Sequence, residues 1–218
     1  MKRTLLFVLA LAVIPVAVDA QGPDLEETRA RAALGDVIAQ FNLGVMYALG
    51  DGVPEDRAES ARWYRLAAEQ GYAVAQYNVG VYYANGRGVP EDDAEAVRWY
   101  RLAAEQGLAT GQFNLGVMYA LGDGVPEDDA EAVRLYRLAA EQGDANAQNN
   151  LGFMYDNGEG VPEDNVLAYM WFNLAAAQGN EDAQRNKDRA ERQMTREQIA
   201  EGQRLSREWI AAHPGIGN

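Results

Sequence analysis

A five-residue block, Gly-Val-Pro-Glu-Asp, recurs along this chain at a fixed interval of 36 residues. Its four copies start at Gly52, Gly88, Gly124 and Gly160. A period of this size is typical of repeat proteins, in which one supersecondary unit cannot bury its apolar face alone. Neighbouring units must stack to make a continuous core. The sequence therefore predicts a solenoid, an architecture that offers a long surface to a partner.

Each unit reads as two helices joined by a glycine loop. In the second unit, apolar residues fall at i, i+4, i+7 and i+8 over residues 74–85, which predicts a first helix. Pro90 and its neighbouring glycines end that helix. Asp92 and Glu95 form a helix-start signal, and the second helix is expected to end at Gly107. The same pattern in every unit predicts an all-α solenoid of helix–loop–helix repeats.

The flanking segments are expected to close the array. The predicted parts are a signal peptide at 1–20, an N-terminal capping helix at 21–35, four repeats at 36–71, 72–107, 108–143 and 144–179, and C-terminal capping helices at 180–218. Thr195 and Gln198 have the spacing of a capping box for the last helix. Terminal units of a solenoid need a polar outer face, which suits these charged flanks.

The first twenty residues have the pattern of a secretory signal. Lys2 and Arg3 precede an apolar run over residues 5–18, and small residues lead to an expected cleavage after Ala20. This predicts a periplasmic or secreted protein with no membrane span once the signal is removed; an uncleaved anchor is the alternative. The chain has no cysteine, so packing alone must stabilise it, and thiolate metal sites and cysteine nucleophiles are excluded.

The chain is acidic, with a formal net charge of −14 at pH 7. The excess of acidic residues lies in the repeats, so nucleic acid and anionic membranes would be repelled. A basic surface on a partner protein would be attracted, although the charge could also serve solubility alone. The charge thus argues against nucleic acid as a partner, and it leaves solubility and a basic protein partner as the two interpretations.

The repeated residues resemble a known family. N-L-G-x-M-Y-x-x-G-x-G-V-P-x-D followed by A-x-x-W-Y-x-x-A-A-E-Q-G is similar to the Sel1-like repeat, a relative of the tetratricopeptide repeat, over residues 36–179. The resemblance implies a right-handed α/α superhelix that acts as an adaptor or scaffold in protein–protein assembly. We expect it to be a monomer.

Several repeated residues are expected to have structural roles. A glycine inside each first helix costs about 1 kcal/mol against alanine, so it should permit close approach of the second helix and its tryptophan. Tyrosines at helical spacing in the second helices are expected in the core. These structural residues are Gly44, Gly80, Gly116, Gly152, Trp63, Trp99, Tyr100 and Tyr136.

A second apolar stripe on the first helices suggests where a partner could bind. It lies two residues, and therefore about 200°, from the core stripe. It could serve packing between repeats, or it could line an inner face that holds a partner's helix or extended segment. The candidate binding residues are Phe41, Val45, Tyr77, Val81, Asn85, Phe113, Val117, Phe153 and Asn157. Asparagines such as Asn78 could likewise clasp a peptide backbone or fix a neighbouring loop.

The residues offer little for catalysis. The only histidine is His213, and Ser60 and Ser206 are the only serines. The acidic loops lack the ligand spacing of a calcium site and fit helix capping better, so no metal or cofactor is expected. We therefore expect no enzyme. The alternatives are a cell-wall or carbohydrate-binding or -processing protein and a structural oligomer that stacks end to end.

Overall fold

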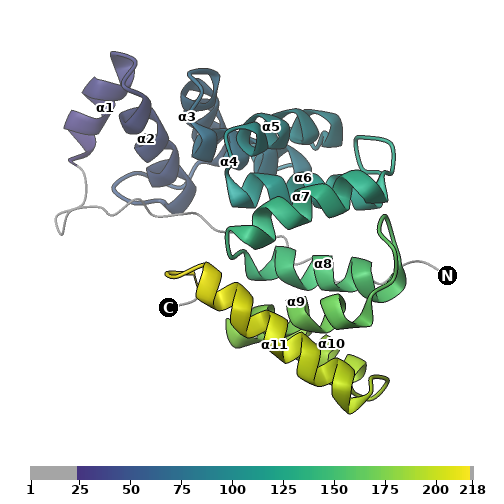
Figure 1. Ribbon diagram of the computed structural model, residues 1–218. Helices are drawn as coiled ribbons and strands as arrows, with labels where there is room; N and C mark the ends of the chain where they lie inside the picture. Colours follow the sequence, from purple (N-terminus) through teal and green to yellow (C-terminus); the bar gives the residue numbers. More distant parts are fainter. Residues whose placement is uncertain (1–23, 217–218) are drawn as a thin grey trace. The chain divides into compact units, whose positions relative to one another are not determined.

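The computed structural model describes residues 24–216, and within that range it contains eleven α-helices and no strand (Figure 1). The predicted signal peptide lies outside the described residues. The all-α repeat solenoid expected from the 36-residue period is confirmed. The helices are α1 (Leu25–Ala33), α2 (Val37–Leu49), α3 (Arg57–Glu69), α4 (Ala73–Ala84), α5 (Asp93–Glu105), α6 (Ala109–Leu121), α7 (Asp129–Glu141), α8 (Ala145–Asn157), α9 (Asn165–Ala177), α10 (Glu181–Glu191) and α11 (Arg196–Ala212).

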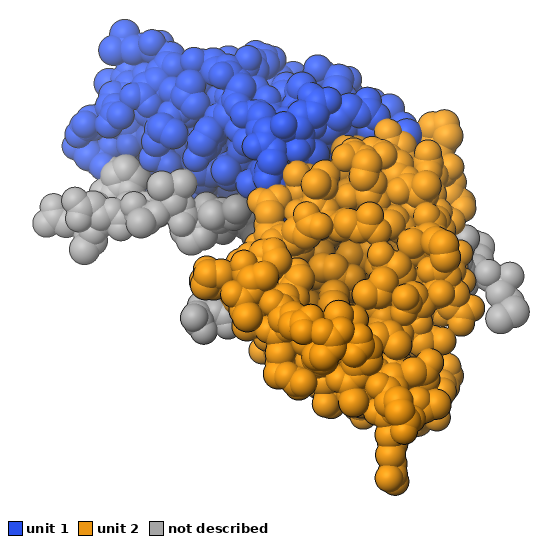
Figure 2. Space-filling view, viewed as in Figure 1, with its two compact units in different colours: residues 1–111, 123–125 blue, residues 112–122, 126–218 orange. Residues whose placement is uncertain are grey.

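The chain divides into two compact units (Figure 2). Unit 1 comprises residues 1–111 and 123–125, and unit 2 comprises residues 112–122 and 126–218. In unit 1 each helix from α1 to α5 packs on the next. In unit 2, α8 packs on both α7 and α9, and α10 and α11 each pack on α9. Both units are therefore built by the same rule of consecutive helix pairs.

The Gly-Val-Pro-Glu-Asp block starts each second helix. Its aspartate is the N-cap: the Asp92 Oδ1 accepts the Glu95 N–H at 3.0 Å, and the Asp128 Oδ1 accepts the Glu131 N–H at 3.0 Å. Its glycine has a positive φ, and a Cβ at Gly88 would collide with the carbonyl oxygen of Arg57 at the start of α3. The block that contains Gly88 thus caps α5, and its loop lies against the start of α3, the second helix of the preceding repeat.

The glycines inside the first helices permit close approach, as expected, but the ring that they accommodate is a different one. A Cβ added at Gly44 would lie 2.6 Å from the Tyr64 ring, and one at Gly80 would lie 2.6 Å from the Tyr100 ring. Gly116 faces Tyr136 and Gly152 faces Phe172 in the same way. The expectation that the tryptophans need this room was wrong. Each tryptophan is one residue earlier, about 100° around the helix, so it points elsewhere.

Trp63 instead packs beside α2 and α1. Leu43 and Met46 of α2 form a cluster with Ala32 of α1, and Trp63 lies against it. Trp99 lies in the corresponding cluster with residues of α3 and α4. The stripe expected to form the core of each first helix therefore faces the preceding repeat. The second stripe faces the tyrosine of its own second helix, so both sides of a first helix are core.

The segment after the fourth repeat keeps the repeat's register. α10 begins 36 residues after α8. The Asn180 Oδ1 caps α10 by accepting the Ala183 N–H at 2.9 Å, as the Asp144 Oδ1 caps α8 through the Ala147 N–H at 2.9 Å. The expected capping box at the start of α11 is present, since the Gln198 N–H donates to the Thr195 Oγ1 at 3.2 Å. α10 and α11 follow without the glycine loop, and each of them packs on α9.

Candidate interaction surface

The aromatic residues of the second stripe are buried. Phe41 and Tyr77 are each 1% exposed, and Phe113 is 4% exposed. Each ring lies against the tyrosine of its own second helix, with Phe41 5.5 Å from Tyr64 between ring centroids. Tyr77 pairs with Tyr100 at 6.0 Å, and Phe113 with Tyr136 at 5.9 Å. Phe41 also packs on the next repeat, with its ring centroid 5.2 Å from that of Tyr72. These side chains are closed to a partner in this conformation, because they are core.

The remaining candidate residues are partly accessible. Val81 and Val117 are buried, whereas Val45 and Phe153 are half-buried. Two asparagines bond one turn back in their own helices and so close the helix ends. The Asn85 Nδ2 donates to the Val81 carbonyl at 2.7 Å, and the Asn157 Nδ2 donates to the Phe153 carbonyl at 2.8 Å.

In unit 1 the exposed residues of α2 lie in a different register, and the equivalent residues of α4 are half-buried or buried. Positions at i, i+4, i+7 and i+11 share one side of a helix. The two sets are Ile38, Asn42, Val45 and Leu49 on α2, and Val74, Asn78, Val81 and Asn85 on and directly after α4. We call these eight residues the asparagine face. Sequence reasoning had included Val45, Val81 and Asn85, but it missed the exposed Ile38 because it followed the aromatic residues.

The asparagine face is apolar and uncharged. Ile38 is 42% exposed and Leu49 is 63% exposed. Neither α2 nor α4 contains a single Asp, Glu, Lys or Arg, whereas α3 between them has five. A helix whose open side meets only water normally carries charged residues there. On α2 this uncharged side exposes Ile38 and Leu49, which is typical of a binding surface. On α4 no residue is exposed, so burial explains its lack of charge.

Asn78 in the centre of this face has an unpaired donor. The residue is 6% exposed, and its Nδ2 has no hydrogen-bond partner. A buried polar group without a partner costs about 1–3 kcal/mol, so natural structures rarely keep one without a reason. The Nδ2 has almost no accessible surface, so a carbonyl oxygen of a bound polypeptide would accept from it only after the surrounding side chains move.

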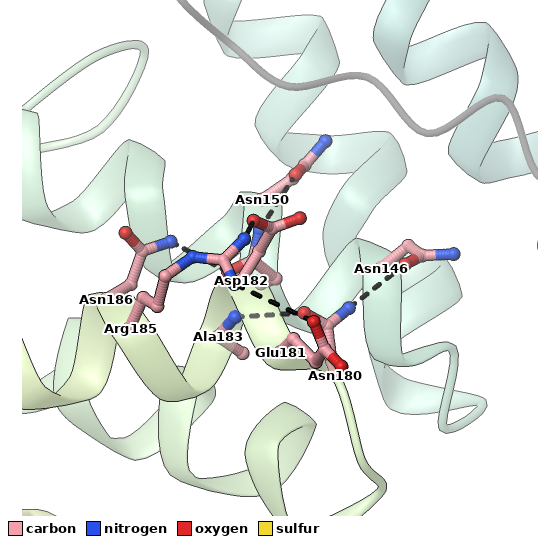
Figure 3. A network of polar contacts seen from close by, with 9 residues as sticks. Asn146, Asn150, Asn180, Glu181, Asp182, Ala183, Arg185 and Asn186 are labelled. Atoms are coloured by element: carbon pink, nitrogen blue, oxygen red, sulfur yellow. Dashed lines mark hydrogen bonds and ion pairs between the residues drawn. The ribbon is translucent and has the colours of Figure 1, made fainter.

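In unit 2 the equivalent of Asn78 is Asn150, which belongs to a network of hydrogen-bonded asparagines (Figure 3). The Asn180 Nδ2 donates to the Asn146 Oδ1 at 3.0 Å, and the Asn186 Nδ2 donates to the Asn149 Oδ1 at 2.9 Å. The Asn149 Nδ2 in turn donates to the Asn150 Oδ1 at 3.3 Å. The side chains of α10 thus bond the surface of α8, which is the equivalent of α4.

A glutamine relay that sequence reasoning missed ties the helix pairs together. The Gln70 Nε2 at the end of α3 donates to the Gln40 Oε1 at 2.7 Å, and the Gln40 Nε2 donates to the Ala32 carbonyl at 3.2 Å. The same relay runs from Gln178 to Gln148 at 2.8 Å and on to the Ala140 carbonyl at 3.1 Å. The signal was present as a glutamine at the same place in each first helix. Its partner is 30 residues away, which a single sequence does not reveal.

The groups that could serve catalysis are engaged in structure. The Ser60 Oγ donates to the Gly44 carbonyl at 2.8 Å, and the Ser206 Oγ donates to the Gly202 carbonyl at 2.9 Å. Burial raises the pKa of the Tyr100 and Tyr136 hydroxyls, so both stay neutral. Within residues 24–216, no group of three or more histidines and carboxylates is placed to hold a metal. In the same range, no helix has both the length and the apolar character to cross a bilayer.

The comparisons agree with the repeated geometry. The family model described as Sel1 repeat matches residues 37–72, 73–108, 109–144 and 145–180. No curated protein matches the chain. The structure is similar to a protective antigen with an SLR fold, c5321, present in uropathogenic Escherichia coli strains, with a TM-score of 0.80 and 36% identity over 85% of this chain. It is also similar to a Sel1 repeat protein from Oxalobacter formigenes, with a TM-score of 0.66 and 39% identity over 72% of this chain.

This chain spans 40% of the first of these proteins and 46% of the second. Sel1 repeats generally mediate protein binding, and proteins built from them are typically scaffolds without catalytic activity. Four matched repeats cover well over half of the chain. The chain therefore belongs to the Sel1 repeat family.

Proposed function

We propose that this protein is a non-enzymatic scaffold of the bacterial envelope or secreted fraction that binds another polypeptide on the asparagine face of α2 and α4. The observation that carries the proposal is the pair of exposed aliphatic residues Ile38 and Leu49 on α2, a helix without a charged residue. The exposed side chains of Ile38 and Leu49 supply the apolar area that a partner would cover. A ligand that fits this face would have aliphatic side chains to cover Ile38 and Leu49, and a carbonyl oxygen to accept from the Asn78 Nδ2.

An extended segment of a partner protein meets both requirements. Its backbone offers one carbonyl oxygen per residue, and its side chains alternate between two sides. Since α2 and α4 lack charge while the whole chain is acidic, basic residues of the partner would act at the rim. They would speed the encounter, whereas the apolar contacts and the amide of Asn78 would hold the complex.

The chain's organisation supports a role outside the cytoplasm. Residues 1–20 act as a signal that is removed after Ala20, residues 21–35 and 180–218 close the ends of the array, and the mature protein is a monomer. N-terminal sequencing of the protein recovered from the periplasm or the medium should begin at Gln21. A mature chain that still carries Met1 would contradict cleavage.

Site-specific photo-crosslinking tests the surface. A photoreactive benzoylphenylalanine is placed at Leu49 on the asparagine face, and a matched control carries it at Leu138 on α7, which is 37% exposed. The Leu49 probe should crosslink one discrete partner from the envelope or medium, and Asn78→Leu should abolish that product. Equal products from both positions, or a product that survives Asn78→Leu, would show that the partner binds elsewhere.

A further inference from the structure

Unit 2 contains a cavity of about 160 Å³ near its C-terminal residues. Leu174 and Ala177 at the end of α9 form one wall, and Trp209 and His213 at the end of α11 form another. The other lining residues are Gln178, Ile210, Pro214, Gly215 and Ile216. The lining is therefore mainly apolar, and none of these residues belongs to the asparagine face.

The C-terminal segment is held over the cavity by specific contacts. Ile216 lies on the bare backbone of Gly143, where a Cβ would collide with its side chain. The Ile216 N–H also donates to the His213 carbonyl at 3.3 Å. Because Gly143 has no side chain, the segment can lie flat against the turn before α8 and form part of the wall.

One wall of the cavity is aromatic and has a polar atom. The rings of Trp209 and His213 stack at 4.2 Å between centroids, with 18° between their planes. The His213 Nδ1 lies 2.8 Å from the Trp209 carbonyl. A carbonyl only accepts, so Nδ1 carries the proton, and in the neutral ring Nε2 is left as an acceptor. Gln178, which also lines the cavity, already uses its Nε2 as a donor to Gln148.

We propose that this cavity is a binding site for a small monocyclic aromatic molecule with one hydroxyl donor, of the phenol class. The volume matches one benzene-sized ring, for which about 150 Å³ suffices. Ala177, Ile210 and Pro214 of the lining are exposed, so the ring would be covered on one side only. The ring would occupy the space between Leu174 and Trp209, and the hydroxyl would donate to the His213 Nε2. The site goes beyond the proposed polypeptide binding, because it lies on other helices and takes another class of ligand.

Phenol and toluene form a matched pair of probes, since they have nearly the same shape but only phenol can donate. The full mature chain is titrated with each while the indole N–H signals of its four tryptophans are followed by NMR. We expect phenol to shift the Trp209 signal saturably and to leave those of Trp63 and Trp99 in place. His213→Phe should keep a ring on Trp209 and make the two probes bind equally.

Ala177→Leu should fill the cavity and weaken phenol binding by at least about tenfold. The matched control is Ala33→Leu, which changes the equivalent exposed position of α1 and should leave binding unchanged. Phenol binding that persists in Ala177→Leu, or toluene binding as tightly as phenol to the wild type, would overturn the assignment. Tighter binding of N-acetyltyrosinamide than of phenol would overturn it too, in favour of a tyrosine from a partner protein.

Discussion

α4 in unit 1 and α8 in unit 2 occupy the same position of the repeat, yet their open sides differ. On α4 the Asn78 amide is buried without a partner, whereas on α8 the asparagines bond one another and α10. The repeat therefore specifies a packed interior but not what the outer asparagines bind. A neighbouring helix of the same chain satisfies them at one end, and we infer that a partner protein does so at the other.

The largest expected effect falls on a feature that both units share. Gly80→Leu and Gly152→Leu would each drive a side chain into a ring, that of Tyr100 or Phe172. Overpacking of this kind should cost about 3 kcal/mol in either unit. Chemical denaturation of both variants measures the loss. A much smaller loss for one variant would show that its unit can relax, and that the two interiors are not equivalent.

A smaller effect separates the two interiors. The Ser60 Oγ lies 2.8 Å from the Tyr82 hydroxyl in unit 1, whereas Ala132 and Met154 occupy the equivalent positions in unit 2. Ser60→Ala should cost about 1–3 kcal/mol, because it leaves the Tyr82 hydroxyl and the Gly44 carbonyl with one partner fewer. Adding Tyr82→Met should restore most of the lost stability, because the double variant has the same alanine and methionine as unit 2. A double variant no more stable than the single one would show that the polar pair is not the cause.

Substituting the equivalent asparagines Asn78 and Asn150 should change the free energy of unfolding in opposite directions. Asn78→Leu should raise the free energy of unfolding by about 1 kcal/mol, because it removes an unpaired buried amide. Asn150→Leu should lower it, because the Asn149 Nδ2 loses its acceptor. Thermal melts of the two variants measure the contrast. A loss of stability in Asn78→Leu would mean that the amide is already satisfied, which would remove one support for the asparagine face.

The smallest expected effect is a dependence on pH at two equivalent N-caps. Hydrogen bonding to the Ala39 N–H and then to Arg31 lowers the pKa of Asp36, so its stabilisation is present at neutral pH and lost as pH falls through that pKa. Burial raises the pKa of Asp144, so its ionised form opposes folding once pH rises past the value of the unfolded chain.

Asn retains the cap at both positions, so it isolates the charge. Asp36→Asn should lower the melting temperature at pH 7, and this loss should shrink as pH falls below the ordinary aspartate pKa of 3.8. Asp144→Asn should raise it at pH 7 and leave it unchanged at pH 3. Shifts of the same sign at pH 7 would show that the two caps have the same environment, against the contrast seen in the structure.

Much of the fold could be read from single residues. The proline and glycines of each loop, the aspartate caps and the helical spacing of apolar residues act within a few residues of themselves, so they located the helices. The sequence did not decide which side of each first helix is exposed, because that depends on where the neighbouring helices lie. Phe41 and Tyr77 could have packed in the core or lined an inner face, and the structure places both in the core, because the first helix is covered on both sides. Ile38 was not predicted to be exposed, because its exposure depends on which helices pack against α2.

The sequence by itself determined the period, the helix pairs and the absence of charge on α2 and α4, since these depend on local chemistry. Only the tertiary structure decided that Tyr64 and Tyr100, and not the tryptophans, meet the helix glycines. It also decided that glutamines 30 residues apart form a relay, and that Asn78 is left unpaired while Asn150 is not. These are contacts between helices, and their partners depend on how the repeats pack in three dimensions.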